Sequence, residues 1–419
     1  MSEVEDTTLE IDHNVYILGA GFSVEAGYPL VRNFMDLMRE AYLTKKEESD
    51  RKSLKKVLNF RQKVSSAAYR TIFDPENIED LFSLATATQN DKSDMAIAIA
   101  ETLSHCKNKR IDKALSFPVL LKEGEIITGF DQNNMIGEPK YPIIDRFKLY
   151  AGIMAGKWGN TSISSNSFIT FNYDLVLEEA FQLFKIPFRY DGLPEPYEGL
   201  LRAMGFGFDL IYHDLPNTFV TDSKQNDAVS LIKLHGSINW AVDYTKKNEK
   251  PKEFHIYSSY TDSLAHDIRE SSDTFVQDKE LVLIPPVWDK GTTHGENPLF
   301  RMWSQAIKKL RTATRIIVIG YSLPPTDAHF RYLLAAGLQE NISLKKIVFV
   351  DPGLKEGDPN RPLLEERIFG IFRKELMEKG ILEFIGLEAN EFFTNQKDSR
   401  KHENILNRKF PPLPHYWES

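Results

Sequence analysis

The chain has 419 residues, of which 42% are hydrophobic and 27% are charged, and this balance is typical of a globular protein with a sizeable core. Its formal net charge of −8 argues against the broad basic surface of a nucleic-acid-binding protein, so we expect no direct nucleic-acid partner.

The cysteine count and the hydropathy pattern exclude further classes. Cys106 is the single cysteine, so the sequence allows neither an internal disulfide nor a four-cysteine zinc site, and we expect no zinc. No apolar run reaches the length of about 18 residues that a membrane-spanning helix needs. The acidic first residues lack the basic and apolar regions of a signal peptide, and we therefore expect a cytoplasmic protein.

The stretch from 14 to 40 has the pattern of a strand, a glycine turn and a helix. Residues 15–18 are a short apolar run that predicts a buried strand, and residues 33–40 carry apolar side chains at helical spacing. Gly19 and Gly21 permit a sharp turn that brings backbone N–H groups near a ligand. Such a turn can hold a pyrophosphate, but Val24 replaces the third glycine of the dinucleotide fingerprint, and a plain tight turn explains the pattern equally well.

Two more predicted strands end in polar residues. Asn172 and Asp174 follow the strand at 168–171, and His235 follows the strand at 229–234. Open α/β sheets bind their ligands at the carboxyl ends of the strands, and histidine, with an unperturbed pKa of about 6.5, suits proton transfer. Structural roles stay open, because Asn172 can start a turn, Asp174 can cap a helix, and a lone histidine at a strand end is more often structural.

Residues 315–319 and 346–350 predict two further buried strands. Gly320 and Ser322 follow the first, and Asp351 follows the second. An acid at the end of such a strand can accept hydrogen bonds from ribose hydroxyls, but it can also cap the turn that follows.

Taken together, these motifs resemble the sirtuin family. No single motif is specific, but they occur in the order that the family has. The nucleotide loop, the TQNID block, the catalytic-histidine block and the GTS block all have counterparts. In chain order these are GAGFS at 19–23, AGYP at 26–29, Arg32, TFNYD at 170–174, HG at 235–236 and GYS at 320–322.

The resemblance implies an α/β fold with a Rossmann-like parallel sheet flanked by helices and a large helical insertion at about 40–160. The sequence then divides into a flexible N-terminus at 1–12, a sirtuin-like NAD-binding domain at 13–355 and a small C-terminal α/β extension at 356–419. In the extension we predict a helix near 363–379 and a strand at 381–384.

The chain also departs from the deacylating sirtuins. In those enzymes a four-cysteine zinc ribbon follows the histidine block, but residues 241–280 contain no cysteine. Leu30 and Val31 stand where the family has Asp and Phe, and the loss of that aromatic ring fits hydrolysis better than acyl transfer. The stretch PPVWDK at 285–290 is similar to the bacterial sirtuin-like branch found in antiphage defence.

By this resemblance the chain is an NAD+ hydrolase (NADase) that takes NAD as its substrate and depletes it. Asn172 would position the attacking water or a ribose hydroxyl, His235 would act as general base through that hydroxyl, and Asp174 would contact the nicotinamide end. Asp351 would bind the adenosine ribose, although sirtuins usually carry Asn there. The residues expected to hold phosphates and ribose are Gly19, Ala20, Gly21, Ser23, Arg32, Gly320 and Ser322.

Three other functions stay open, namely an NAD-dependent protein deacylase, a non-catalytic subunit that binds NAD or ADP-ribose, and a scaffold that does neither. Because NAD depletion is toxic, an active enzyme should be gated by assembly or by a partner. We therefore expect a homo-oligomer and, by resemblance, a separately encoded HerA-type ATPase as partner.

Overall fold

The computed structural model describes most of the chain. Residues 1–11, which belong to the segment expected to be flexible, lie outside the described residues. The described residues are 12–88, 92–113, 120–122, 125–127, 146–158, 162–193, 209–221, 227–244, 253–260, 264, 278–285, 298–324, 328–394, 398–408 and 410.

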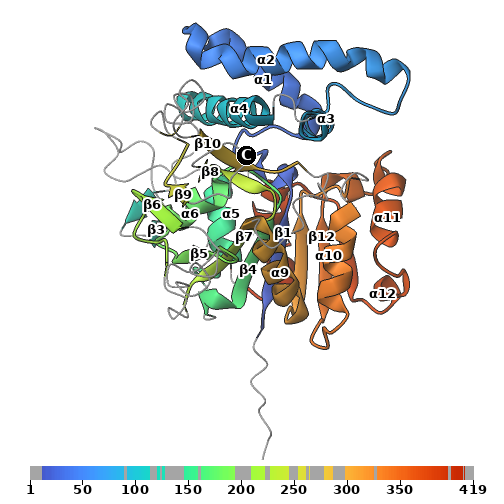
Figure 1. Ribbon diagram of the computed structural model, residues 1–419. Coiled ribbons are helices and arrows are strands. Elements are labelled where there is room, and N and C mark those ends of the chain that lie inside the picture. The colour runs from blue at the N-terminus through green and yellow to red at the C-terminus, as the bar shows by residue number, and fades with distance from the viewer. Residues whose placement is uncertain are drawn as a thin grey trace, which may run out of the picture.

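A seven-stranded parallel sheet forms the centre of the molecule (Figure 1). Its strand order is β13-β12-β11-β1-β4-β7-β5, and each neighbouring pair is parallel. Helices cover both faces of such a sheet, and its central strands β1, β4, β7, β11 and β12 are accordingly almost fully buried. The strands are β1 (Asn14–Leu18), β4 (Asn166–Thr170), β5 (Phe188–Tyr190), β7 (Val229–Lys233), β11 (Arg315–Ile319), β12 (Lys346–Val350) and β13 (Leu382–Ile385).

The strand order reverses between β1 and β11. From β1 the chain proceeds through β4 to β7 on one side, whereas β11 leads to β12 and β13 on the other. Right-handed crossovers therefore place α5 (Arg146–Met154) and α6 (Val176–Leu183) on one face and α10 (Ala328–Leu338) on the opposite face. A crevice outside the carboxyl ends of the strands at such a reversal is the usual ligand position in open α/β sheets.

Four helices form a separate layer over the carboxyl ends of the parallel strands (Figure 1). They confirm the expected helical segment after β1. The layer consists of α1 (Phe34–Thr44), α2 (Glu48–Val64), α3 (Ile78–Ala87) and α4 (Lys92–Lys113). The remainder of the range expected as an insertion contains the hairpin of β2 (Leu120–Lys122) and β3 (Glu125–Ile127), and helix α5, which packs on α6.

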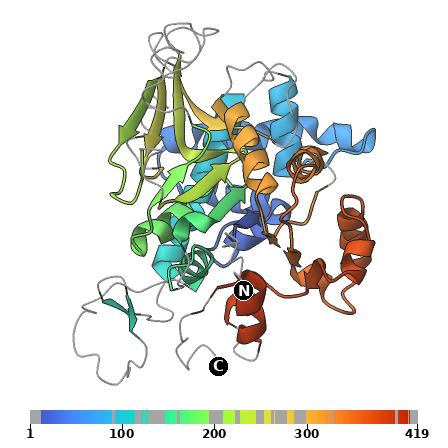
Figure 2. The same cartoon turned by 90° about the horizontal axis from the view of Figure 1, so that it is seen from below.

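A second sheet of four strands, which the sequence analysis does not predict, lies beside the first. Its order is β10-β8-β9-β6, and β8 is antiparallel to both of its neighbours. Figure 2 shows it as a distinct layer at one side of the molecule. Its strands are β6 (Asp209–His213), β8 (Gly236–Tyr244), β9 (Glu253–Tyr257) and β10 (Asp278–Leu283).

The C-terminal part continues the main sheet, because β13 pairs with β12. The helix predicted near 363–379 is two helices, α11 (Arg361–Phe369) and α12 (Glu375–Glu378). Helices α13 (Ala389–Thr394) and α14 (Ser399–Leu406) lie near the start of β1 (Figure 2), where the Asn14 side-chain amide donates to the Leu406 backbone oxygen at 2.9 Å. The proposed domain boundary at 355 therefore falls between two strands of one sheet. Among the described residues, the other long helix is α9 (Pro298–Arg311).

None of the described helices is both long and apolar enough to cross a membrane.

Candidate functional site

The loop after β1 is pressed against the end of β11. The Gly19 N–H donates to the Ile319 oxygen at 3.1 Å, and the Gly21 N–H donates to the Gly320 oxygen at 2.9 Å. A Cβ atom at Gly21 would lie 2.7 Å from Gly320 Cα, which is closer than side chains pack. The glycines of the loop therefore permit backbone to touch backbone at the point where the strand order reverses. These two N–H groups were expected near a ligand, but they donate to the last residue of β11 and to the glycine that follows it.

Gly320 itself also needs to be glycine, because of both its backbone conformation and a close backbone contact. Its φ of +61° lies in the left-handed region, and a Cβ there would be 2.3 Å from the Phe22 nitrogen. Gly357 has a φ of +81° with no atom within 4 Å of the same position, so it provides a matched control.

We expect Gly320→Ala to lower the free energy of unfolding clearly more than Gly357→Ala does. Each alanine bears the left-handed strain of about 1–2 kcal/mol, but only the one at 320 also collides with backbone. Urea unfolding of the two variants measures the difference. Equal losses would mean that the contact between the two loops contributes nothing to stability.

Asn172 connects the end of β4 to the glycine loop. Its side-chain amide donates to the Gly19 backbone oxygen at 2.9 Å and to the Ser23 hydroxyl oxygen at 3.0 Å. Three residues that the sequence analysis selects, Gly19, Ser23 and Asn172, thus form one hydrogen-bonded chain. Against the larger effect of burial, the Ser23 hydroxyl also lowers the pKa of the nearby Asp174 carboxyl.

Asp174 is buried and starts a helix, as the structural alternative allowed. Its Oδ1 accepts from the Val176 N–H at 3.1 Å, at the first residue of α6. Burial raises the pKa of the Asp174 carboxyl, and the positive charge of Lys233 and the hydrogen bond from Ser23 act in the opposite direction. This capping role does not test the contact with nicotinamide, which stays a prediction.

His235 follows β7 by two residues and is 7% exposed. Its ring meets the Phe171 ring edge-on, with centroids 5.1 Å apart, and Phe171 stacks on Tyr321 at 4.6 Å. Because these rings follow β7, β4 and β11, an aromatic cluster joins the ends of three strands. Gly236 turns the chain into β8 with a φ of +87°, where a Cβ would lie 1.9 Å from the Val282 oxygen.

A buried ion pair, which the sequence did not predict, lies next to this site. Lys233, at the end of β7, is 1% exposed, and its ammonium donates to Glu178 Oε1 at 2.9 Å and to the Asp174 backbone oxygen. The Tyr190 hydroxyl donates to the same Glu178 oxygen at 2.9 Å, and burial followed by the Glu178 charge raises the pKa of Tyr190. A lysine at the end of an apolar strand has the pattern of a solvated strand end, so the sequence offers no signal for this pair.

A small pocket extends from the hydrogen-bonded chain to the ion pair. His235 is not one of its lining residues. The pocket is lined by Leu18, Phe22, Ser23, Thr170, Asn172, Asp174, Val176, Leu177, Glu178 and Lys233.

The remaining predicted residues are less closely joined to this group. Ala20 and Ser23 are the ends of the short 3-10 turn in the glycine loop, whereas Arg32 is exposed in the next such turn. Ser322 is exposed, and its backbone oxygen accepts from Arg367 at 3.1 Å. Asp351 caps the turn after β12, where its Oδ1 accepts from the Gly353 N–H at 2.8 Å, and burial raises its pKa. The turn-capping alternative is thus observed, and the ribose contact stays a prediction.

A comparison with protein families gives a match that covers the site residues from Asn172 onwards. Residues 166–369 match the family model of the SIR2-like domain. The matched stretch runs from β4 to α11, so it contains Asn172, His235, Gly320 and Asp351 and begins after the glycine loop. It supports a sirtuin-type fold for this part of the chain, and strands β1 and β13, which lie outside the match, complete the sheet.

Solved structures of Sir2 proteins are also similar to the chain over most of its length. One is Sir2 in complex with the inhibitor EX-527, 2′-O-acetyl-ADP-ribose and a deacetylated p53 peptide, at 14% identity, with 94% of each chain covered and a TM-score of 0.35. Another is Sir2 with a p53 peptide and NAD+, at 12% identity, with 93% of this chain and 92% of that chain covered and a TM-score of 0.34. The comparison with curated proteins gives no match.

Proposed function

We propose that the chain hydrolyses the nicotinamide–ribose bond of NAD+ and releases nicotinamide and ADP-ribose. The observation that carries this proposal is the position of Asn172 and His235 at the ends of the neighbouring strands β4 and β7, next to the glycine loop. The SIR2-like match, which includes both residues, supports a site that binds and processes NAD.

The chemistry suits these side chains. Loss of nicotinamide leaves an oxocarbenium-like ribose, which must form in a site closed to bulk solvent. His235, packed against Phe171 and almost wholly buried, would take a proton from a ribose hydroxyl or from the water behind it. The Asn172 amide, held by Gly19 and Ser23, would orient that water. Water then supplies the oxygen on the ribose carbon, and nicotinamide leaves with the electrons of the broken bond.

Hydrolysis and deacylation differ in the group that attacks the ribose. The sequence has no cysteine between 241 and 280 with which to form the zinc ribbon of the deacylases, and Val31 replaces their shielding aromatic residue. These two departures favour water over an acyl-lysine oxygen. We propose further that the activity serves as a toxic NAD-depleting effector in antiphage defence, gated by homo-oligomer assembly and a HerA-type ATPase partner.

The deciding experiment is an NAD+ turnover assay with the purified chain, alone and together with the product of its neighbouring gene. We expect nicotinamide and ADP-ribose in equal amounts, with or without an acetyl-lysine peptide. Formation of acetyl-ADP-ribose only when the peptide is present would identify a deacylase. Tight binding of ADP-ribose without any turnover would identify a regulatory subunit.

We expect NAD+ to be cleaved much better than NADP+, and Asp351→Asn to narrow the gap. A 2′-phosphate carries a charge of about −1.5 to −2 near neutral pH, so an ionised Asp351 beside the ribose would repel it. The measurement is kcat/KM for both dinucleotides in the wild type and the variant. If Asp351 only caps its turn, the substitution lowers stability and leaves the ratio of the two values unchanged.

A further inference from the structure

The second sheet brings ligating side chains from three strands to one of its faces. Asp243 of β8 lies directly opposite Glu253 of β9, and directly paired residues share a face. His255 is two residues after Glu253, so it projects from that face as well. His213 of β6 pairs with Tyr257, which is again two residues further along β9. The strand register alone therefore gathers two carboxylates and two imidazoles.

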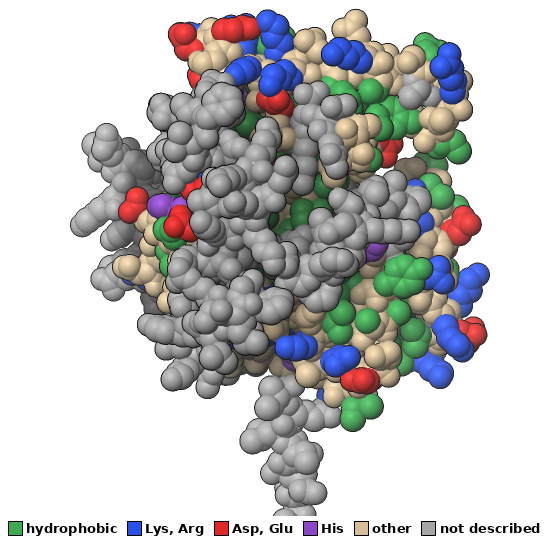
Figure 3. Space-filling view, viewed as in Figure 1, with side chains coloured by type: hydrophobic (Ala, Val, Ile, Leu, Met, Phe, Trp, Pro, Cys, Tyr) green, Lys and Arg blue, Asp and Glu red, His purple; other side chains and the backbone are tan. Residues whose placement is uncertain are grey.

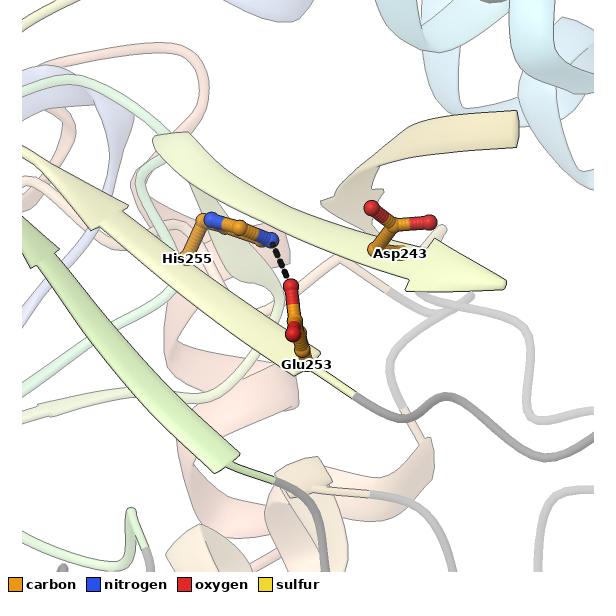
Figure 4. Close-up of side chains that lie close together, drawn as sticks. All are labelled: Asp243, Glu253 and His255. Carbon is orange, nitrogen blue, oxygen red and sulfur yellow. Dashed lines mark ion pairs between the residues drawn. The ribbon is translucent and has the colours of Figure 1, made fainter. Parts of the chain in front are cut away.

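We propose that Asp243, Glu253 and His255 bind a divalent transition-metal ion of the Zn²⁺ type. One ligand atom from each of the three residues lies within 4.8 Å of the others. His255 Nε2 is 3.4 Å from Glu253 Oε2, and Figure 4 shows the imidazole and this carboxylate pointing toward each other. Two ligands of a tetrahedral zinc ion with bonds of about 2.0–2.1 Å are about 3.3–3.4 Å apart, so the spacing of His255 and Glu253 matches coordination. The Asp243 carboxylate, which lies within 4.8 Å of both, moves closer when the ion binds.

His213 supplies the support that a metal-binding imidazole needs. Its Nε2 lies 2.9 Å from His255 Nδ1, and the two rings are stacked. When His255 Nδ1 donates to His213, the lone pair of His255 Nε2 faces Glu253, and a cation satisfies both groups. His213 also stacks on Tyr257 with ring centroids 4.2 Å apart, which fixes the plane of the supporting ring.

Burial and ligand type favour zinc over magnesium or calcium. The His255 side chain is 5% exposed and Asp243 is 7% exposed, whereas the Glu253 side chain is 41% exposed and leaves an entry path. Figure 3 shows histidine and acidic side chains together at the surface over β6 and β9. An imidazole ligand suits zinc and its neighbours, whereas magnesium and calcium prefer oxygen ligands alone. Lys279 of β10 lies opposite Asp243 and is a competing positive charge on this face.

This site is independent of the proposed hydrolase chemistry and differs from the cysteine site that the sequence excludes. It departs from the expectation of no zinc, which rested on the cysteine count. Strand β8 begins directly after His235, so an ion that ties β8 to β9 would stiffen the strand that leads out of the candidate active site.

The test is Zn²⁺ binding by the full chain after EDTA treatment and dialysis, measured by elemental analysis and by competition with a fluorescent chelator. We expect one Zn²⁺ per chain and a rise in thermal midpoint on adding Zn²⁺. Asp243→Asn, Glu253→Gln and His255→Gln should each weaken binding at least about 100-fold, and His213→Gln about 10–100-fold. Mg²⁺ at the same concentration should not shift the midpoint.

The matched control is Glu280→Gln. Glu280 pairs with Val242 and so projects from the opposite face of the sheet, and its replacement removes the same charge. It should bind Zn²⁺ as the wild type does, and far-UV circular dichroism establishes that every variant is folded. Failure of the wild type to bind zinc, or equal weakening in Glu280→Gln, would overturn the proposal.

Discussion

His235→Ala will lower the rate of NAD+ cleavage by about 10²–10⁴-fold, the usual cost of losing a general base. The imidazole follows the end of β7 and contacts Phe171 and Tyr173, so its removal leaves the strand core in place. The measurement is nicotinamide release at saturating NAD+, together with ADP-ribose affinity. We expect kcat to fall while the Kd for ADP-ribose stays close to that of the wild type.

Asn172→Ala should cause a loss of similar size through a different route. The Asn172 amide, at the end of β4, donates to Gly19 and Ser23. The variant therefore loses both the group that orients the water and two hydrogen bonds that hold the glycine loop. We therefore expect KM to rise as kcat falls. His105→Ala is the control for both variants, because His105 lies in α4 of the helical layer and pairs with Glu40. Turnover near the control value in either site variant would remove that residue from the catalytic role.

Glu178→Ala will destabilise the fold by about 3–5 kcal/mol, because it leaves a buried lysine charge without its carboxylate. Lys233 is 1% exposed and Glu178 is 8% exposed, so bulk solvent has little access to the lysine charge that the variant leaves behind. The Tyr190 hydroxyl loses its acceptor at the same time. Urea unfolding followed by circular dichroism gives the free energy of unfolding.

Two further variants separate charge from packing. The double variant Lys233→Met with Glu178→Leu should recover most of the loss, because an apolar pair of similar volume needs no desolvation of charge. Lys55→Ala breaks the exposed pair with Glu48 and should leave the unfolding midpoint nearly unchanged. A Glu178→Ala variant as stable as Lys55→Ala would mean that Lys233 finds another anion or solvent.

The parallel sheet was predictable because each of its central strands has a recognisable sequence pattern of its own. Strands β1, β4, β7, β11 and β12 are almost fully buried, and each contains consecutive apolar residues shortly before a glycine or a polar residue. The parallel sheet flanked by helices is confirmed. The order of the motifs along the chain also brought Gly19, Ser23 and Asn172 into one hypothesis, and the structure joins them by hydrogen bonds.

The second sheet and the ion pair were missed for physical reasons. Strand β9, with the sequence EFHIY, alternates charged or polar with apolar residues over only five positions, which is too short to stand out. The pairing of Lys233 with Glu178 depends on how α6 packs on β7, and neither residue type signals burial. The single helix predicted near 363–379 is divided because the chain turns after Gly370, where its N–H closes the last turn of α11.

The central position of β1 also has a consequence for synthesis on the ribosome. β1 pairs on one side with β4 and on the other with β11, about 300 residues later in the chain. At about 5–20 residues per second, roughly 15–60 s separate the emergence of the glycine loop from that of Gly320, its backbone partner. A nascent or truncated chain that stops before β11 therefore has a β1 edge without its neighbour and half of a candidate site. Any activity of this site is therefore withheld until translation has passed Gly320.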